Sequence, residues 1–172
     1  MFITNINHVA ISKFKPGVFL PLIAVFLLFG ILISSLFYFT AQTRTYIIPV
    51  IVVPVCLFFM FWILKGELWN KAVKVSILND RIKVSPFMGY GKAKELYFSE
   101  MEGYKISILP DEYRDYEFLY LIKAGRKVVK ISEFYHANYR QLKMEITSKC
   151  KKLPSEKFSV LREWKDIWES GR

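Results

Sequence analysis

Two stretches of the sequence decide the fold: VFLPLIAVFLLFGILISSLFYF at residues 18–39 and YIIPVIVVPVCLFFMFWIL at residues 46–64. Neither stretch contains a charged side chain. At a rise of about 1.5 Å per residue, helices of these lengths would be roughly 33 and 28 Å long, which matches the ~30 Å hydrocarbon core of a bilayer. The sequence therefore predicts an integral membrane protein with a transmembrane hairpin over residues 18–64.

A cleaved signal peptide and a buried soluble hairpin both agree less well with the first stretch. A signal peptide has a shorter apolar core and a small-residue cleavage site, and no such site follows residue 39. A buried hairpin of a soluble protein, apolar on all sides, would need more surrounding protein than the rest of the chain supplies.

The basic residues predict the orientation of the hairpin. The connection between the two stretches, residues 40–45, contains a single charge, Arg44. The opposite ends of the stretches carry more: Lys13, Lys15, Lys65, Lys71, Lys74, Arg81 and Lys83. Because lysine and arginine concentrate on the cytoplasmic side of a membrane, we predict a multi-pass protein of the inner (cytoplasmic) membrane with both termini in the cytoplasm.

The hairpin itself is predicted to be an anchor. Neither stretch contains an ionisable Asp, Glu, His, Lys or Arg, and ion or proton pathways usually need such groups at membrane depth. Pro54 lies inside the second stretch and is expected to kink or loosen it. Gly30 and Ser34, four residues apart, would allow close contact between helices.

After the hairpin the apolar residues alternate, which is typical of half-buried strands. Six strands are predicted, at residues 71–78, 81–85, 92–98, 101–109, 116–123 and 127–132. Short turns such as Asn79-Asp80 and Ala124-Gly125 connect them, so we expect a meander forming one twisted sheet of six or seven antiparallel strands. Residues 1–17 are compatible with either a short strand or an interfacial segment.

The apolar period then changes to that of a helix, predicted over residues 133–152 with Ser132 as its N-cap. Its apolar face consists of Tyr135, Tyr139, Leu142, Ile146 and Cys150. This helix is expected to close the open end of the sheet.

Residues 154–172 form a second amphipathic pattern. Phe158, Leu161, Trp164 and Trp168 recur at helical spacing, with Ile167 beside them. Such a helix would lie on the membrane surface, or dock on the sheet domain or a partner.

Two segments carry a resemblance to a known family: VKVSILNDRIKV at residues 73–84 and GYGKAKELYFSEMEGY at residues 89–104. In their order after two apolar helices, they resemble bacterial membrane proteins with a PH-like domain. The resemblance covers residues 69–153 and implies a PH-like barrel with a terminal helix and no catalysis. The implied organisation is a cytoplasmic segment (1–17), the hairpin (18–64), the PH-like domain (68–153) and an amphipathic helix (154–172).

The sequence contains little that predicts catalysis. The two histidines, His8 and His136, are far apart in sequence, and no His, Cys, Asp and Glu cluster has metal-ligand spacing. Cys56 and Cys150 are expected to be packing residues rather than a disulfide. We therefore predict no catalytic residue, no cofactor, no metal and no enzymatic activity, and no nucleic-acid partner, because no nucleic-acid-binding motif is present.

The basic excess predicts an interaction with an anionic surface. The net charge is +10, and lysines near anionic lipid can each contribute about 1 kcal/mol. The candidate lipid-facing residues are Lys65, Lys71, Lys74, Lys149, Lys151 and Lys152. The candidate interfacial anchors are Trp62, Trp69, Trp164 and Trp168.

Two functions are compatible with these features. The first is a membrane-anchored interaction module that binds a protein partner or anionic lipid headgroups. The second is a membrane-embedded inhibitor or immunity-type protein that recognises its target through the hairpin.

Overall fold

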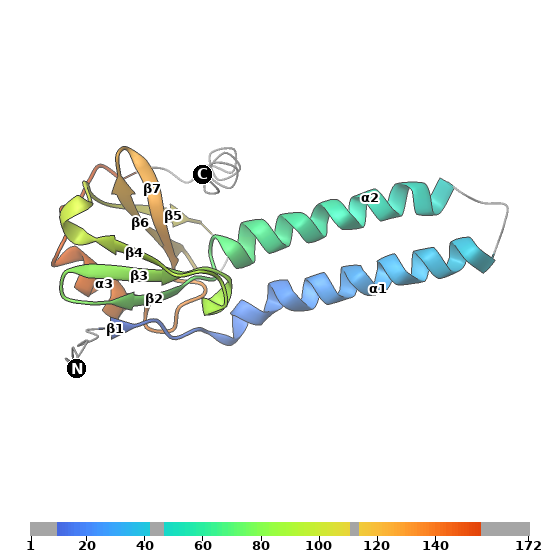
Figure 1. The fold of residues 1–172 in the computed structure, drawn as a ribbon, viewed down its shortest axis with the longest axis horizontal. Coiled ribbons are helices and arrows are strands. Elements are labelled where there is room, and N and C mark those ends of the chain that lie inside the picture. Colours follow the sequence, from blue (N-terminus) through green and yellow to red (C-terminus); the bar gives the residue numbers. More distant parts are fainter. Residues whose placement is uncertain (1–9, 42–46, 111–113, 156–172) are drawn as a thin grey trace, which may run out of the picture.

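The computed structural model describes residues 10–41, 47–110 and 114–155. Two helices, α1 (Leu20–Ala41) and α2 (Ile47–Trp62), lie side by side and project from a sheet domain (Figure 1). A 3₁₀ turn, η1 (Pro16–Phe19), precedes α1, and a π-helical segment, η2 (Ile63–Trp69), continues α2 into the domain. The predicted hairpin of two long apolar helices is confirmed.

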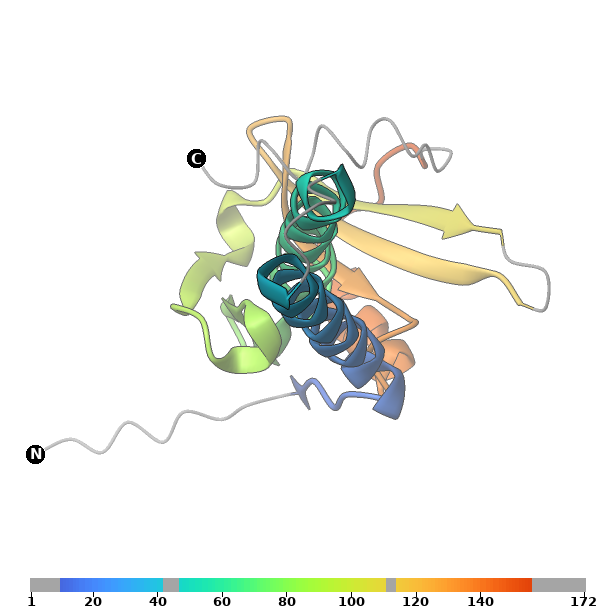
Figure 2. The same cartoon turned by 90° about the vertical axis from the view of Figure 1, so that its right-hand side faces the viewer.

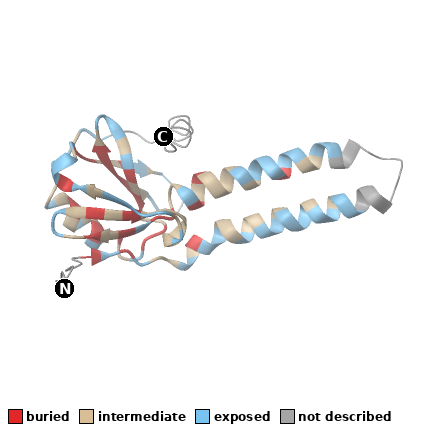
Figure 3. Cartoon of the chain, viewed as in Figure 1, coloured by how far each residue is buried: buried red, intermediate tan, exposed pale blue. Residues whose placement is uncertain are grey.

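The hairpin exposes most of its apolar side chains (Figure 3). Two helical spans, Pro16–Phe37 and Val50–Trp69, are long and apolar enough to cross a membrane, and only 11% of each is buried. A core helix of a soluble protein would be mostly buried, whereas here the rings of Phe26 and Phe37 are 72% exposed. The helix α2 stays α-helical through Pro54, and its hydrogen-bond pattern changes only at Ile63.

Within the described residues, seven strands form the domain, and all pairings between them are antiparallel. The first sheet has the order β1-β2-β3-β4, with β1 at Ala10–Ile11, β2 at Lys74–Ile77, β3 at Arg81–Ser85 and β4 at Lys94–Tyr97. The second has the order β5-β6-β7, with β5 at Gly103–Leu109, β6 at Tyr116–Lys123 and β7 at Arg126–Ser132. The six strands predicted from the alternation are confirmed.

The prediction of one continuous sheet is wrong, because β4 and β5 are not paired in the structure. A 3₁₀ turn, η4 (Phe98–Glu100), separates them. Phe98 is buried, and its N–H donates to the Asp80 carbonyl oxygen at 3.0 Å. This contact holds the end of β4 to the first sheet, so the chain turns away and starts a second sheet. Figure 2, which looks along the hairpin, shows the first sheet on one side of the helices and β5 and β6 on the other.

The N-terminal segment supplies the seventh strand. Ala10 and Ile11 pair with Ile77 and Ser76 of β2, so the chain before the hairpin belongs to the same sheet as the chain after it. Residues 1–9 lie outside the described part of the chain.

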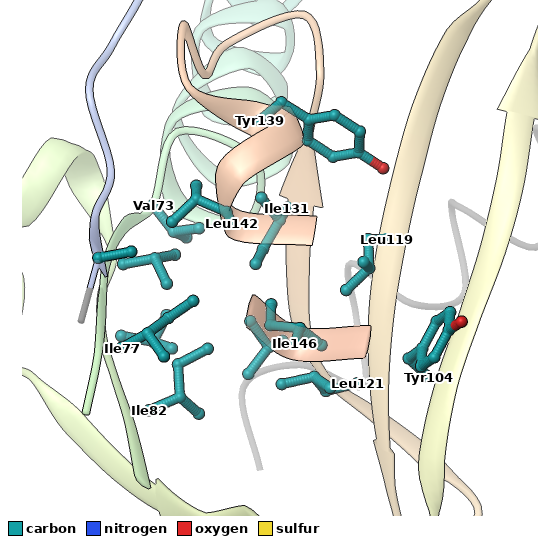
Figure 4. Close-up of a cluster of buried hydrophobic side chains, with 14 of the residues drawn as sticks. Val73, Ile77, Ile82, Tyr104, Leu119, Leu121, Ile131, Tyr139, Leu142 and Ile146 are labelled. Carbon is teal, nitrogen blue, oxygen red and sulfur yellow. The ribbon is translucent and has the colours of Figure 1, made fainter. Parts of the chain in front are cut away.

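The main core lies between the two sheets (Figure 4). Val75, Ile77 and Ile82 of the first sheet face Leu119 and Leu121 of the second, and all five are fully buried. The helix α3 (Tyr139–Thr147) covers the core with the completely buried side chains of Leu142 and Ile146.

The helix α3 is shorter than the predicted 133–152. Residues 133–138 form a turn because their backbone bonds to other segments: the Tyr135 carbonyl, which would accept from Tyr139 in a helix, accepts from the Lys15 N–H at 2.8 Å. The predicted cap is also wrong. The Ser132 hydroxyl accepts from Phe134 N–H at 3.2 Å, and Asn138 precedes the helix.

Candidate functional site at the base of the hairpin

The segment before α1 is bound to the sheet domain on two sides. The Ser12 N–H donates to the Val75 carbonyl, and the Val75 N–H donates to the Ser12 hydroxyl oxygen, each at 2.8 Å. On the other side the Ala137 N–H donates to the Lys13 carbonyl at 2.7 Å, and Lys15 Nζ donates to the Glu133 carbonyl at 2.7 Å. The start of the hairpin is therefore fixed to the domain.

The end of the hairpin is fixed by a polar contact from η2. The buried Tyr135 hydroxyl donates to Glu67 Oε2 at 2.6 Å, and Lys71 forms an ion pair with Glu67 Oε1. Burial, and then the negative charge of Glu67, raise the pKa of the Tyr135 hydroxyl above its usual value. Tyr135 thus stays protonated and acts as a donor to the carboxylate.

A histidine with no exposed surface lies beside this contact. His136 Nδ1 lies 2.8 Å from the Ser132 carbonyl oxygen, and Nε2 lies 2.8 Å from the Val73 carbonyl oxygen. Burial lowers the pKa of His136, while the two carbonyls act in the opposite direction. The imidazole connects the turn after β7 with the start of β2, which is a structural role.

Apolar contacts complete the junction. Val18, Leu68 and Ala72 are completely buried and form one cluster with Tyr135. Phe87 and Met88 of the 3₁₀ turn η3 (Phe87–Gly89) pack against this cluster, and the Met88 N–H donates to the Ala72 carbonyl at 2.6 Å. The loop between β3 and β4 is therefore held at the base of the hairpin.

The six candidate lysines are not brought together. Lys65, Lys71 and Lys74 lie at the base of the hairpin, where η2 leads into β2. Lys65 Nζ lies 5.8 Å from the Phe61 ring centroid, Lys71 pairs with Glu67, and Lys74 is exposed on β2.

The other three lysines lie at the opposite end of the domain. Lys149 Nζ donates to the carbonyl of Asn79, in the turn at the far end of β2, at 2.8 Å. Lys151 and Lys152 are exposed and run beside Tyr104, near the start of β5.

The candidate tryptophans are not brought together either. Trp69 is 47% exposed at the end of η2. Trp62 is half-buried, with its ring 6.4 Å from that of Phe58. Trp164 and Trp168 lie outside the described residues.

The structure also exposes an aromatic residue, in the loop after β3, that no pattern in the sequence identifies. Tyr90 is 88% exposed, and the exposed Lys92 follows it. The loop is packed closely onto β2: Gly89 has φ of 103°, and a Cβ there would lie 2.8 Å from Lys74 Cδ. The available signal was a tyrosine between two glycines followed by a lysine, which by itself indicates only a turn.

We name Lys65, Trp69, Lys74, Tyr90 and Lys92 the basic-aromatic rim. Its members come from η2, the start of β2 and the loop after β3, and the contacts of η3 with η2 bring these segments together. Lysine methylenes and aromatic rings are amphipathic, so the rim suits a boundary between an apolar and an aqueous phase.

Within residues 10–41, 47–110 and 114–155, no group of three or more His, Cys, Asp and Glu side chains is arranged to hold a metal ion. Cys56 is buried in α2, and Cys150 packs at the edge of the main core. Burial raises the pKa of the Cys150 thiol.

No family model matches the chain, and neither the curated proteins nor the solved structures gave a significant match. The fold and the junction define the chain as a two-helix apolar hairpin joined at both ends to an antiparallel two-sheet domain with a C-terminal helix.

Proposed function

We propose that the chain is an integral membrane protein whose PH-like domain acts as a non-enzymatic interaction module on the cytoplasmic face. The observation that carries this proposal is the basic-aromatic rim at the base of an exposed apolar hairpin. In this proposal α1 and α2 cross the inner membrane, and the rim lies at the level of the headgroups.

The exposed surface of the hairpin supports membrane insertion. Side chains such as Phe26, Phe37 and Val50 are between 67% and 72% exposed, and large exposed apolar surfaces of this kind are unstable in water. Because β1 pairs with β2, a membrane-inserted hairpin would have both of its ends on the same side of the membrane, which supports the proposed topology. The bias of basic residues toward that side indicates the cytoplasm.

The rim supports binding to anionic lipid. Tyrosine and tryptophan favour the interface between headgroups and acyl chains, and each lysine near the surface can contribute about 1 kcal/mol. The arrangement of seven antiparallel strands and a terminal helix is compatible with the PH-like domain that the sequence resemblance implies.

The test uses the full chain in nanodiscs of phosphatidylcholine, with or without phosphatidylglycerol. We expect anionic lipid to slow amide hydrogen exchange in the rim loop, residues 86–92, at low salt, and high salt to remove the effect. The double variant Lys74→Glu, Lys92→Glu should lose the protection.

The matched control is Lys151→Glu, Lys152→Glu, which makes the same charge change on exposed lysines at the opposite end of the domain. It should retain the protection. Equal loss in both variants would show that net charge, rather than the rim, is responsible. Exchange that does not respond to anionic lipid in the wild-type chain would reject lipid binding and leave a protein partner as the ligand of the module.

The second candidate function is recognition of a membrane target by the hairpin. A groove between α1 and α2, lined by Phe26, Gly30, Ser34 and Val52 among others, favours it. Small side chains in such a groove let another helix approach closely. Substituting Gly30→Leu and Ser34→Leu would abolish target binding in this case, while the interaction-module proposal predicts no change in anionic-lipid binding.

A further inference from the structure

The outer face of the first sheet presents lysine and serine side chains at alternating positions. In the register of β2 with β3, Lys74 lies opposite Ser85, and Ser76 lies opposite Lys83. Val75, which lies between Lys74 and Ser76, is completely buried in the main core, so these four side chains point to the other face. Because the Cβ atoms of opposite residues are about 4.5–5.5 Å apart, the lysines and serines share a small area of the sheet.

The strand before the hairpin adds a third lysine to this area. Ser12 is buried, whereas Ile11 and Lys13 on either side of it are exposed. Ile11 pairs with Ser76 of β2. Continuing this antiparallel register by two residues places Lys13 opposite Lys74. We name the area the lysine-serine face; it comprises Lys13, Lys74, Ser76, Lys83 and Ser85.

The positive charge of this face is only partly neutralised. Within the part of the chain that the structure describes, neither Lys13 nor Lys74 has an ion-pair partner. Lys83 Nζ lies 3.5 Å from Glu95 Oε1, but the same carboxylate also pairs with Arg81 Nη1 at 3.3 Å. The side chains of Lys83 and Glu95 are each 45% exposed, and exposed ion pairs of this kind contribute little to stability. All three lysines can therefore turn to a bound anion.

The two serine hydroxyls are donors that the fold does not use. Ser76 and Ser85 are partly exposed, and neither hydroxyl forms a hydrogen bond with another described residue. A hydroxyl is both a donor and an acceptor, and it rotates to suit its partner. Since each serine lies opposite a lysine, both hydroxyls can donate to an anion that is bound among the lysines.

The loop after β3 closes the hairpin end of this face with a strained backbone. Phe87 and Met88 have φ of 55° and 56°, in the left-handed region that residues other than glycine rarely adopt. Gly89 follows with φ of 103°, and a Cβ on it would lie 3.3 Å from Lys74 Cβ, so its backbone packs against the stem of Lys74. Strain of this kind must be maintained by surrounding contacts, and it is found preferentially at functional sites.

The number and kind of donors match a phosphate group held by a single ester bond. At pH 7 a phosphomonoester carries a charge of about −1.5 to −2 and has three acceptor oxygens. The ammonium groups and hydroxyls of the face supply the charge and the donors that such a group needs. A phosphodiester has a single negative charge and fewer free oxygens, so it would leave part of the face unsatisfied.

The position of the lysine-serine face suits a lipid headgroup. The start of β2 and the end of β3 lie next to the base of the hairpin, whereas the turn that joins them lies at the far end of the domain (Figure 1). Lys74 and Ser85 therefore lie nearer to the hairpin than Ser76 and Lys83. In the proposed topology this end of the face lies at the level of the lipid phosphates.

We propose that the lysine-serine face is a binding site for a phosphomonoester, supplied either as the headgroup of phosphatidic acid or as a soluble glycerol phosphate. This goes beyond a general attraction to anionic lipid, because it assigns a preferred phosphate chemistry and the residues that recognise it. The lipid form of the proposal rests on the proposed function, which places this face at the membrane surface. The soluble form does not.

The test is native mass spectrometry of the full chain in a neutral detergent, which resolves individual bound lipids. Phosphatidic acid and phosphatidylglycerol with identical acyl chains are titrated separately, and the dissociation constant of the first bound lipid is measured. We expect phosphatidic acid to bind at least about tenfold more tightly, because it forms additional hydrogen bonds to a charged group. Equal affinities would mean that the chain responds to net charge alone and would overturn the proposal.

The variant Ser76→Ala, Ser85→Ala removes both hydroxyls without changing the charge. Its affinity for phosphatidic acid should fall about tenfold, whereas its affinity for phosphatidylglycerol should stay the same. The matched control is Ser99→Ala, Ser148→Ala, at exposed positions outside the face, and it should bind both lipids as the wild type does. If the two variants bind phosphatidic acid equally well, the serines do not contact the phosphate and the proposal is wrong.

A lysine variant outside the rim separates this proposal from the proposed function. Lys13→Gln, Lys83→Gln should weaken the binding of phosphatidic acid at least about tenfold, whereas Lys151→Gln, Lys152→Gln should weaken it less than about twofold. Because the rim is intact in both variants, phosphatidylglycerol should still protect residues 86–92 from hydrogen exchange. Equal weakening by the two variants, with that protection intact, would overturn the phosphomonoester site and leave the proposed function standing.

A soluble competitor distinguishes the two sources of the phosphomonoester. Displacement of bound phosphatidic acid by glycerol phosphate would support a site that accepts soluble phosphomonoesters. Binding of phosphatidic acid that resists this competitor would support the lipid headgroup as the ligand. If neither compound binds to the wild-type chain, the face holds no phosphate site and the proposal is overturned.

Discussion

The contact between Tyr135 and Glu67 should set how firmly the hairpin is held to the domain. Removing the hydroxyl with Tyr135→Phe keeps the ring in the apolar cluster and deletes only the 2.6 Å hydrogen bond to the carboxylate. A hydrogen bond to a charged group is worth about 1.5–3 kcal/mol. Since 1 kcal/mol shifts Tm by ~4–8 °C in a domain of 60–100 residues, the loss should be large enough to measure.

The assay is thermal unfolding of the full chain in detergent micelles, followed by circular dichroism in the tyrosine region. Because a single variant also reports changes in packing, the contact itself is measured by a double-mutant cycle with Glu67→Gln. We expect an interaction energy of about 1.5–3 kcal/mol between the two substitutions.

Tyr139 supplies the matched control. It is also buried, and its hydroxyl lies near the Glu117 carboxylate but meets no acceptor with the geometry of a hydrogen bond within the described residues. Tyr139→Phe should therefore leave Tm unchanged or raise it. Effects of Tyr135→Phe and Glu67→Gln that add to within ~0.5 kcal/mol would refute the reasoning, because independent sites behave in this way.

Three further predictions concern the domain. Burial lowers the pKa of His136 in the folded chain below its unfolded value of about 6.5, so the fold favours the neutral imidazole. The Tm measured by circular dichroism should therefore fall as the pH decreases below about 6.5, and it should fall less steeply in the His136→Gln variant. Gly103→Ala should lower the free energy of unfolding, measured with a chemical denaturant, by more than about 3 kcal/mol, because the added Cβ would meet the Lys151 carbonyl oxygen. The control Gly125→Ala has φ of 69° and open space around its Cβ, so it should lower the same free energy by only ~1–3 kcal/mol, from backbone strain alone. Leu119→Ala should lower the free energy of unfolding by about 2–5 kcal/mol, because it leaves a cavity in the core. Ile108 is half exposed on β5, so Ile108→Ala should lower it by less than ~1 kcal/mol in the same measurement.

The strands and the two apolar helices were predictable because their signals are local. The alternation of Val75 and Ile77 with Lys74 and Ser76 determines which face of β2 is buried, whatever the rest of the chain does. The break between the two sheets was not predictable in this way. It depends on the contact of Phe98 with Asp80, residues 18 apart in sequence.

The helix start was mispredicted for a related reason. The spacing of Tyr135 and Tyr139 suits a helix. The Tyr135 carbonyl, however, accepts a hydrogen bond from the backbone N–H of Lys15, 120 residues earlier in the sequence, so it does not pair with Tyr139 in a first helical turn. The lysines of the candidate site were grouped by their charge, whereas the direction of α3 places Lys149 far from Lys65. The high solvent exposure of Tyr90 also depends on contacts between distant parts of the sequence, because the preceding Phe87 and Met88 pack against Val18 and Leu68.

The pairing of β1 with β2 has a consequence for how the protein is made. The two strands are neighbours in the sheet, yet the entire hairpin lies between them in the sequence. Ala10 and Ile11 are synthesised before the hairpin and have no β2 partner until residues 74–77 have been made. The first sheet therefore closes only after both helices have been synthesised, and in the membrane topology proposed above a closed sheet would report that both ends of the hairpin lie on one side.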